Sequence, residues 1–195
     1  MQIASVPLED RFVRLEPFEE GLEAEVKTAL DCDPEAWGVM VAPAYGDHFD
    51  AWWNAALSAM QTQTRIAYAV RRRSDGAVVG TTSLYEINPA YRRCEIGSTF
   101  YRPEARGGAI NPACKRLLLG HAFDAGAVRV EIITDAVNAR SQAAILKLGA
   151  KAEGVLRKHK ITWTGRARDT AMFAVIDDDW AEVRERLDRR LAAFA

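Results

Sequence analysis

The chain has 195 residues, of which 49% are hydrophobic and 27% charged, and its formal net charge is −1 at pH 7. These values predict a folded globular protein with a substantial core and give no general reason to expect nucleic-acid binding. No apolar stretch approaches the ~18 residues of a membrane span, no signal-peptide layout is present, and the three cysteines show no CxxC pairing, so we expect a cytoplasmic protein without disulfides or a metal site.

Hydrophobic spacing predicts short strands and amphipathic helices in alternation. Asp75–Gly76 separates two alternating runs and indicates a hairpin turn. Asn138 and Gly149 frame a short helix as its N-cap and its C-terminal glycine. Strands are expected at 11–17, 65–73, 77–87, 94–101, 128–134, around 152–162 and at 167–176. Helices are expected at 19–32, 48–62, 112–125, 138–149 and 177–194.

The strand at 94–101, the helix at 112–125 and the strand at 128–134 form a predicted βαβ unit. Such a crossover joins parallel strands with a right-handed connection. The hairpins on either side place antiparallel strands beside this pair. We therefore expect one domain, residues 1–195, of the α/β (mixed α+β) class, with a mixed, mostly antiparallel sheet and helices on both faces.

Two glycines stand directly before the central helix in ARGGAINPACKRLLLGHAF, residues 105–123. We expect Asn111 to be the N-cap and Pro112 the first helical residue, which leaves 106–110 as the strand-to-helix loop. Glycine dihedrals, a helix N-terminus and the Arg106 guanidinium together suit a phosphate or pyrophosphate. A purely structural turn explains the same glycines, and the spacing matches neither GxxxxGK[ST] nor GxGxxG.

Several stretches, in the right order, resemble the GNAT superfamily of acyl-CoA N-acyltransferases. Within it, the chain looks like the branch of the ribosomal-protein N-terminal acetyltransferases (RimJ/RimL-like). The stretches cover about residues 78–176: VVGTTSLYEI, CEIGSTFY, RGGAIN, RVEIITDAVNARSQAAILKLGA, EGVLRKH and GRARDTAMFAV. The resemblance implies the GNAT fold, in which the parallel strand pair splays apart, and acetyl-CoA (coenzyme A) as acyl donor, with no metal.

The resemblance also assigns the coenzyme site. Arg106 matches the first position of the family's pyrophosphate loop, whereas Ala109 and Asn111 stand where the family has Gly and Gly or Ala, so the match is imperfect. The implied coenzyme-binding residues are Phe100, Tyr101, Arg106, Gly107, Gly108, Ala109, Ile110, Asn111, Asn138 and Ser141.

Two residues are implied catalytic groups. Glu95 matches the general base of some relatives, although an ion pair with Arg92 or Arg93 would equally explain it. Glu86 and water are the alternative bases. Ser141 matches the family's Asn-x-x-Ser and would protonate the departing sulfur, whereas helix capping alone would explain Asn138.

The charge is unevenly distributed along the chain. Residues 16–50 hold ten acidic residues and one basic residue, whereas 140–168 hold eight basic residues and one acidic residue. We expect the acidic part to face a cationic acceptor and the basic part to face an anionic ligand. The segment 16–64 would then form the acceptor side. The candidate substrate-binding residues are Trp37, Tyr45 and Trp53 from this segment, and Glu86 from the end of a predicted strand. Core packing is the alternative interpretation of the three aromatic residues.

The resulting functional hypothesis is an acetyl-CoA-dependent N-acetyltransferase. It would move an acetyl group to a primary amine, either a protein N-terminus such as that of a ribosomal protein or a small molecule, by direct attack in a ternary complex. The alternative is a non-catalytic acyl-CoA-binding sensor. The basic rear part has few aromatics for base stacking, so no nucleic-acid partner is expected; no membrane partner is expected either, and a homodimer is compatible with the sequence.

Overall fold

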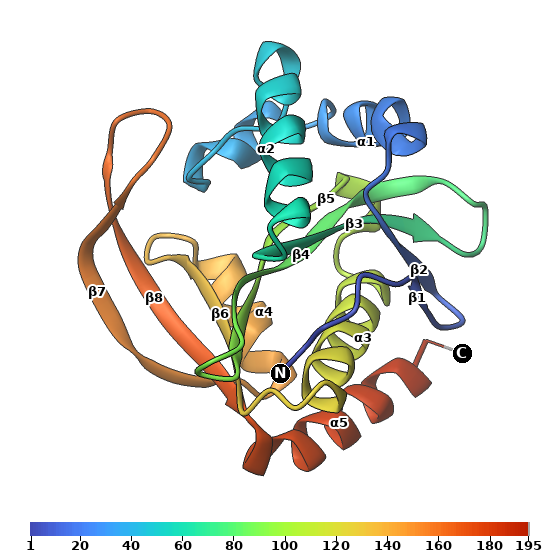
Figure 1. The fold of residues 1–195 in the computed structure, drawn as a ribbon, viewed down its shortest axis with the longest axis vertical. Helices are drawn as coiled ribbons and strands as arrows, with labels where there is room; N and C mark the ends of the chain where they lie inside the picture. Colours follow the sequence, from blue (N-terminus) through green and yellow to red (C-terminus); the bar gives the residue numbers. More distant parts are fainter. Residues whose placement is uncertain (195) are drawn as a thin grey trace.

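Eight strands form one sheet, in the order β1-β2-β3-β4-β5-β6-β8-β7, in the computed structural model, which describes residues 1–194 (Figure 1). The strands are β1 Leu8–Glu9, β2 Val13–Pro17, β3 Arg65–Arg72, β4 Val78–Asn88, β5 Arg93–Tyr101, β6 Arg129–Asp135, β7 Lys151–Ile161 and β8 Ala167–Ile176. The α-helices are α1 Glu23–Leu30, α2 Phe49–Gln61, α3 Ile110–Asp124, α4 Ala139–Leu148 and α5 Asp177–Ala192. Short 3-10 turns are η1 Glu20–Leu22, η2 Pro34–Val39, η3 Gly46–His48 and η4 Pro103–Ala105.

Strand β5 pairs with β6 in parallel, and the other neighbouring pairs are antiparallel, as the βαβ unit and the hairpins predicted. The parallel register runs only from Arg93↔Arg129 to Glu95↔Glu131. Beyond Glu95 the two strands separate, and β8 takes up the free side of β6. The sheet therefore opens at its middle.

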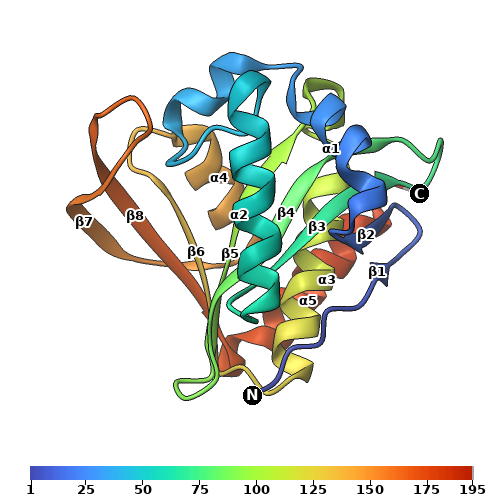
Figure 2. The same cartoon turned by 45° about the horizontal axis from the view of Figure 1, so that its top comes forward.

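The helices cover both faces of the sheet, as predicted, and each face has its own core (Figure 2). Alternation along β3 shows the division, because successive side chains of a strand point to opposite faces. Ile66, Tyr68 and Val70 belong to the core beneath α3 and α5, whereas Ala67 and Ala69 belong to the core beneath α1 and α2. The small alanines leave space for the large aromatic rings of the second core.

Helix ends follow the sequence signals in one case and depart from them in another. Asn138 caps α4 by accepting the Ser141 backbone N–H at 3.0 Å, and Gly149 ends that helix in the left-handed region, both as predicted. The prediction that Asn111 caps α3 is wrong, because the helix begins at Ile110 and Asn111 lies inside its first turn. Pro112 tolerates the earlier start, since the first four backbone N–H groups of a helix have no intrahelical partner.

A β-bulge shapes β5 where it leaves β6. One extra residue lies in β5 between Gly97 and Phe100, and Ser98 adopts a φ of 47°. The ring of Tyr85, from β4, lies directly over Gly97. A Cβ at position 97 would be 2.4 Å from Tyr85 Cε1 and 2.7 Å from its hydroxyl. Gly97 therefore provides the space that the Tyr85 ring occupies.

Replacing this glycine tests that packing. Gly97→Ala forces the Tyr85 ring to move and should lower the free energy of unfolding by about 1–3 kcal/mol, the usual cost of overpacking, measured by urea denaturation. Gly21→Ala is the matched control, since a Cβ at Gly21 meets nothing within 4 Å. Equal stabilities of the two variants would contradict the assignment.

Candidate functional site

A cleft of about 750 Å³ occupies the opening between β5 and β6. Its walls come from the β5 bulge, the end of β6 and the first turns of α3 and α4, with η2 and α2 above them. The predicted site residues that line it are Trp37, Phe100, Tyr101, Arg106, Gly107, Asn111, Asn138 and Ser141. The chain thus brings together residues from positions 37 to 141 at the place where the parallel pairing ends.

The glycine loop forms one end of the cleft. Gly107 has a φ of 81°, which favours glycine, whereas Gly108 needs no such conformation. Gly108, Ala109 and Ile110 do not line the cleft, because the chain turns away into α3. Of the six predicted residues of this loop, only Arg106, Gly107 and Asn111 line the cleft.

Arg106 is held in place by neighbours on both sides. Its Nη1 lies 2.7 Å from Asp33 Oδ2, and its Nε donates to the Tyr101 carbonyl at 2.8 Å. Its guanidinium carbon is 5.4 Å from the centroid of Phe100. Sequence reasoning did not foresee Asp33 as the counter-ion, because the two residues are distant in sequence.

Glu95 is buried beneath the cleft, with 4% of its surface exposed. It accepts a hydrogen bond from the hydroxyl of Tyr85, which lines the cleft. The alternative ion pairs are not formed: Arg93 binds Glu131 at 2.9 Å, and Arg92 donates to the Gly126 carbonyl at 2.8 Å. Burial raises the pKa of Glu95 to about 7, although the Tyr85 hydrogen bond opposes this shift. The carboxyl group thus titrates near neutrality, and its hydrogen bond with the Tyr85 hydroxyl connects it to the cleft.

The aromatic residues of the front segment divide between the core and the cleft. Trp53, which is 2% exposed, packs between Phe18 and Phe49 in the second core. Its prediction as an acceptor residue does not match that position, and the core alternative holds. Tyr45 packs against Trp37 outside the cleft lining.

Trp37 itself lines the cleft and is part of a bridge across it. Its ring stacks on Phe100 with centroids 4.7 Å apart, and its carbonyl accepts the indole N–H of Trp163 at 2.9 Å. Trp163 lies in the turn between β7 and β8. The front segment and the β7–β8 hairpin therefore touch above the cleft.

Glu86 lies on the surface, outside the cleft lining, where β4 is irregular and the residue has a φ of 52°. Its prediction as a substrate-binding residue therefore does not match its position. The irregularity rotates Glu86 away while Tyr85 faces the cleft.

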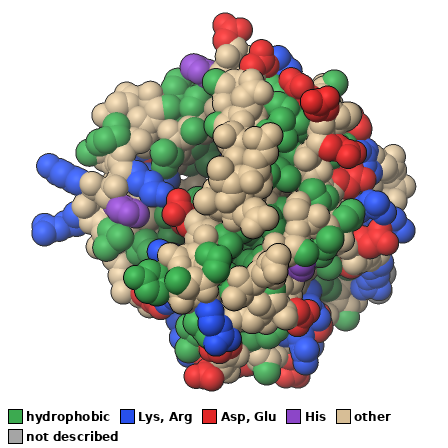
Figure 3. Space-filling model, viewed as in Figure 1, with side chains coloured by type: hydrophobic (Ala, Val, Ile, Leu, Met, Phe, Trp, Pro, Cys, Tyr) green, Lys and Arg blue, Asp and Glu red, His purple; other side chains and the backbone are tan. Residues whose placement is uncertain are grey.

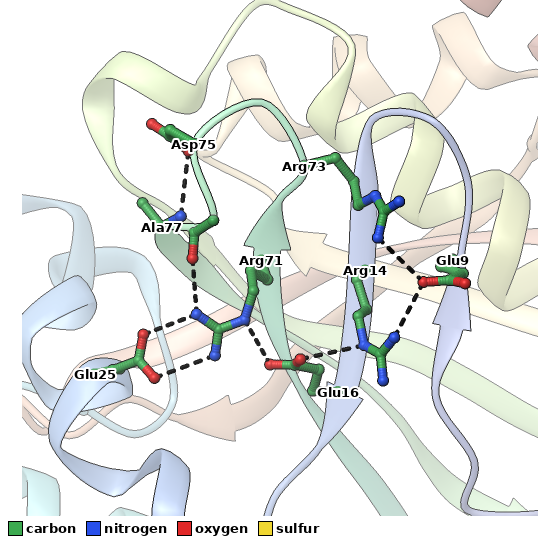
Figure 4. Close-up of polar contacts among 9 residues, drawn as sticks. Glu9, Arg14, Glu16, Glu25, Arg71, Arg73, Asp75 and Ala77 are labelled. Atoms are coloured by element: carbon green, nitrogen blue, oxygen red, sulfur yellow. Dashed lines mark hydrogen bonds and ion pairs between the residues drawn. The ribbon is translucent and has the colours of Figure 1, made fainter.

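The acidic front segment does not form an acidic rim around the cleft. Figure 4 shows Glu16 and Glu25 on Arg71, and Lys27 binds Asp50. In Figure 3 acidic side chains gather over α1, whereas basic side chains project from the β7 side. Asp135 is the one acidic residue of the cleft lining within residues 1–194, and it forms an ion pair with Arg166. The basic residues that line the cleft are Arg65, Arg106, Lys115, Arg140, Lys160 and Arg168.

Lys115, on α3, is the most buried of these cations and was missed from the sequence. It is 5% exposed, and its Nζ donates to Thr99 Oγ1 at 3.2 Å. Thr99 shares a hydrogen bond of 2.9 Å with the hydroxyl of Thr82. No carboxylate within residues 1–194 forms an ion pair with Lys115, and burial lowers its pKa to about 8. The sequence predicts a helix at 112–125, but its pattern gives no reason to expect a buried cation at position 115.

Residues 13–151 match the family model of the GNAT acetyltransferase domain. The chain belongs to this family. Its members are acyltransferases, which agrees with the predicted class of enzyme. The match extends well into the front segment and includes the loop at Arg106 and the start of α4.

Relatives and solved structures agree with this placement. The chain is 26% identical over 117 residues to "Uncharacterized N-acetyltransferase YoaA" of Bacillus subtilis, a match that spans 60% of this chain and 65% of that protein. A GCN5-related N-acetyltransferase from Brucella melitensis superposes with a TM-score of 0.88 at 27% identity, covering 98% of this chain and 87% of the other. RimJ of Mycobacterium smegmatis, solved with CoA-disulfide, shares the fold with a TM-score of 0.78 at 20% identity, covering 97% and 94%. A RimJ structure is thus among those with this fold, as the resemblance led us to expect.

The family implies acetyl-CoA, and the residues present fit such a ligand. A polyanionic coenzyme needs cations and close backbone approach. The cleft offers Arg106 and the left-handed Gly107 at the α3 start, together with the buried cation of Lys115. Within residues 1–194, no helix is long and apolar enough to cross a membrane.

Removing the Lys115 charge should stabilise the protein. Because burial disfavours the ammonium, Lys115→Met should raise the free energy of unfolding at pH 7 by about 1–3 kcal/mol. As pH rises from about 8 toward 10.5, the wild-type lysine loses its charge in the folded state first, so wild type gains stability and the difference shrinks. Urea denaturation at pH 7 and pH 10 measures both effects. A destabilised variant at pH 7, or a difference that grows with pH, would contradict the buried-cation assignment.

Proposed function

We propose that this protein is an N-acetyltransferase that moves the acetyl group of acetyl-CoA to a primary amine. The observation that carries the proposal is the coupled Tyr85–Glu95 pair at the cleft between the separated strands β5 and β6. Acetyl-CoA supplies an activated acyl group as a thioester, and the acceptor nitrogen attacks its carbonyl carbon as the carbon–sulfur bond breaks. Neighbouring residues must remove a proton from the nitrogen and return one to the sulfur.

Coenzyme binding is assigned to the α3 end of the cleft. Arg106 would exchange its contact with Asp33 for a phosphate oxygen, and Gly107 and Asn111 would lie beside the same group. Further along the cleft, Lys115 would place an unpaired positive charge beside the coenzyme. Asn138 and Ser141, at the α4 start, would contact the arm on the opposite wall.

Proton removal is assigned to Tyr85 and Glu95. The Tyr85 hydroxyl lines the cleft and already donates to Glu95, so it can take a proton from the acceptor ammonium while passing its own to the carboxylate. A base with a pKa near the working pH is the most effective one. Ser141 would donate its hydroxyl proton toward the departing sulfur.

The acceptor itself is a primary amine of a protein N-terminus or of a small molecule. A ribosomal-protein-S5-alanine acetyltransferase from Vibrio fischeri shares the fold, which supports a protein acceptor as one choice. The runner-up function is an acyl-CoA sensor without turnover. Glu95 favours catalysis over sensing, because its carboxyl group is buried and has a pKa of about 7. Burying a carboxyl group is costly, and a sensor has no need of one.

Arg106→Ala should weaken coenzyme A binding, since a charge-assisted contact to phosphate contributes about 1.5–3 kcal/mol. Isothermal calorimetry with coenzyme A measures it. Arg102→Ala is the matched control, because Arg102 precedes the same loop but pairs with Glu104 at 2.6 Å and does not line the cleft. Unchanged affinity in the Arg106 variant would remove this residue from the coenzyme site.

Glu95→Gln should lower turnover by about 10²-fold or more, the typical contribution of a positioned base. Wild-type activity should rise as pH increases through about 7, where Glu95 loses its proton, and the variant should lack this step. Thiol release from acetyl-CoA at pH 5.5–9 gives both quantities. Glu86→Gln, at the alternative base, should keep the wild-type profile, and the reverse result would transfer the role to Glu86.

Stability gives an independent check on Glu95. Its pKa is higher in the folded protein than the ordinary value of 4.5. Between pH 4.5 and about 7 the folded state therefore keeps a proton that the unfolded state loses. Wild type should therefore lose stability relative to Glu95→Gln across this window, by up to about 3 kcal/mol. Denaturation at pH 5 and pH 8 measures the change, and a constant difference would contradict the raised pKa.

A further inference from the structure

The lining of the cleft that holds Tyr85 also carries several basic side chains. An acceptor that reaches Tyr85 and Glu95 meets Arg65 from β3 and, from the other side, Lys160 and Arg168 from the β7–β8 hairpin. A simple ammonium would be repelled by these cations. The cations themselves call for a negative group, since buried charges are normally paired.

Arg65 lies directly beside Tyr85, because the two are cross-strand partners in β3 and β4. Its guanidinium is held by two neutral hydroxyls: Nε donates to Ser83 Oγ at 3.1 Å and Nη2 donates to Ser98 Oγ at 3.0 Å. The β5 bulge places Ser98 for this contact. Its guanidinium carbon is 5.5 Å from the Trp52 ring centroid.

No carboxylate of residues 1–194 forms an ion pair with Arg65, whose pKa burial lowers to about 10. A guanidinium has five N–H donors, and the two serines take only two of them. The fork is therefore positioned and its remaining donors are available. Such a planar fork suits carboxylate and phosphate oxygens.

Arg168 provides the second cation. It is 6% exposed, it lines the cleft, and its Nε is buried without a hydrogen-bond partner within residues 1–194. Lys160 is its register partner across β7 and β8 and lines the cleft as well. The nearby carboxylate of Asp135 is already bound to Arg166.

We propose that the acceptor is a small amine that carries a carboxylate or phosphate a few bonds from its nitrogen, and that Arg65, with Arg168 and Lys160, binds this anionic group. This inference rests on the proposed function, because it places the nitrogen at Tyr85 and Glu95. It also replaces the sequence-based expectation of a cationic acceptor, because no acidic residue of the front segment lines the cleft. The anion neutralises the wall while the amine is presented to the base.

Matched pairs of acceptors test the proposal. Glycine is compared with glycinamide, and O-phosphoethanolamine with ethanolamine, so that each pair differs in the anionic group. For wild type we expect kcat/KM of thiol release from acetyl-CoA to be at least tenfold higher for the anionic member of one pair. The pair that responds distinguishes a carboxylate from a phosphate.

Variants assign the preference to the named residues. Arg65→Met should reduce the anionic-to-neutral ratio at least tenfold, whereas Arg157→Gln, which removes a charge from the exposed face of β7 outside the cleft, should leave it unchanged. The affinity for coenzyme A, measured by calorimetry, should be the same in all three proteins. Equal or better turnover of the neutral members, or a ratio that Arg65→Met does not alter, would overturn the proposal while leaving N-acetyl transfer intact.

Binding without turnover separates the two proposals. Calorimetric titration of each acceptor into the protein saturated with coenzyme A reports the anion site directly. Binding of the anionic members that is lost in Arg65→Met, with no acetyl transfer to any amine, would support the anion site and refute the proposed function. No binding of either anionic member would overturn the anion site.

Discussion

The position of the cleft and of the residues around it depends on the short parallel contact between β5 and β6. Three register pairs hold the strands together, and their separation after Glu95 and Glu131 creates the cleft. A parallel pair needs a crossover, and α3 supplies it, so the glycine loop at its start necessarily faces the opening. The bulge in β5 bends the strand further at the same place, which is a common use of bulges beside functional sites.

The polar groups of the cleft are costly for the fold, and their arrangement indicates their use. Glu95 and Lys115 are both nearly fully buried, and neither has an ion-pair partner within residues 1–194. Burial shifts both pKa values toward neutrality, which makes each group responsive near physiological pH. Stable cores avoid such groups, whereas sites that move protons or bind anions require them.

Local patterns predicted most of the fold because they depend on nearby residues. Alternation found seven of the strands, whereas the two-residue strand β1 was not predicted. Asn138 and Gly149 marked the limits of α4. The start of α3 was misplaced because proline is tolerated at several positions of a first turn. Four residues of the cleft lining were not predicted: Arg65, Tyr85, Lys115 and Arg168. Strand and helix periodicity cannot show which polar side chains a fold directs into a cleft. The acidic front segment misled for a similar reason: its partners, such as Arg71, come from a distant strand.

The ion pair between Arg106 and Asp33 connects the two sides of the cleft. Arg106 also lies over Phe100, which stacks on Trp37, whose carbonyl binds Trp163 in the hairpin turn. A ligand that takes Arg106 from Asp33 therefore releases a restraint on η2, the segment that overhangs the opposite half. Free-energy coupling of this kind is reciprocal, so an occupant beneath η2 alters the affinity at Arg106 by the same factor. Through this one exchange of partners, each half of the cleft would change the affinity of the other by the same factor, whichever half is filled first.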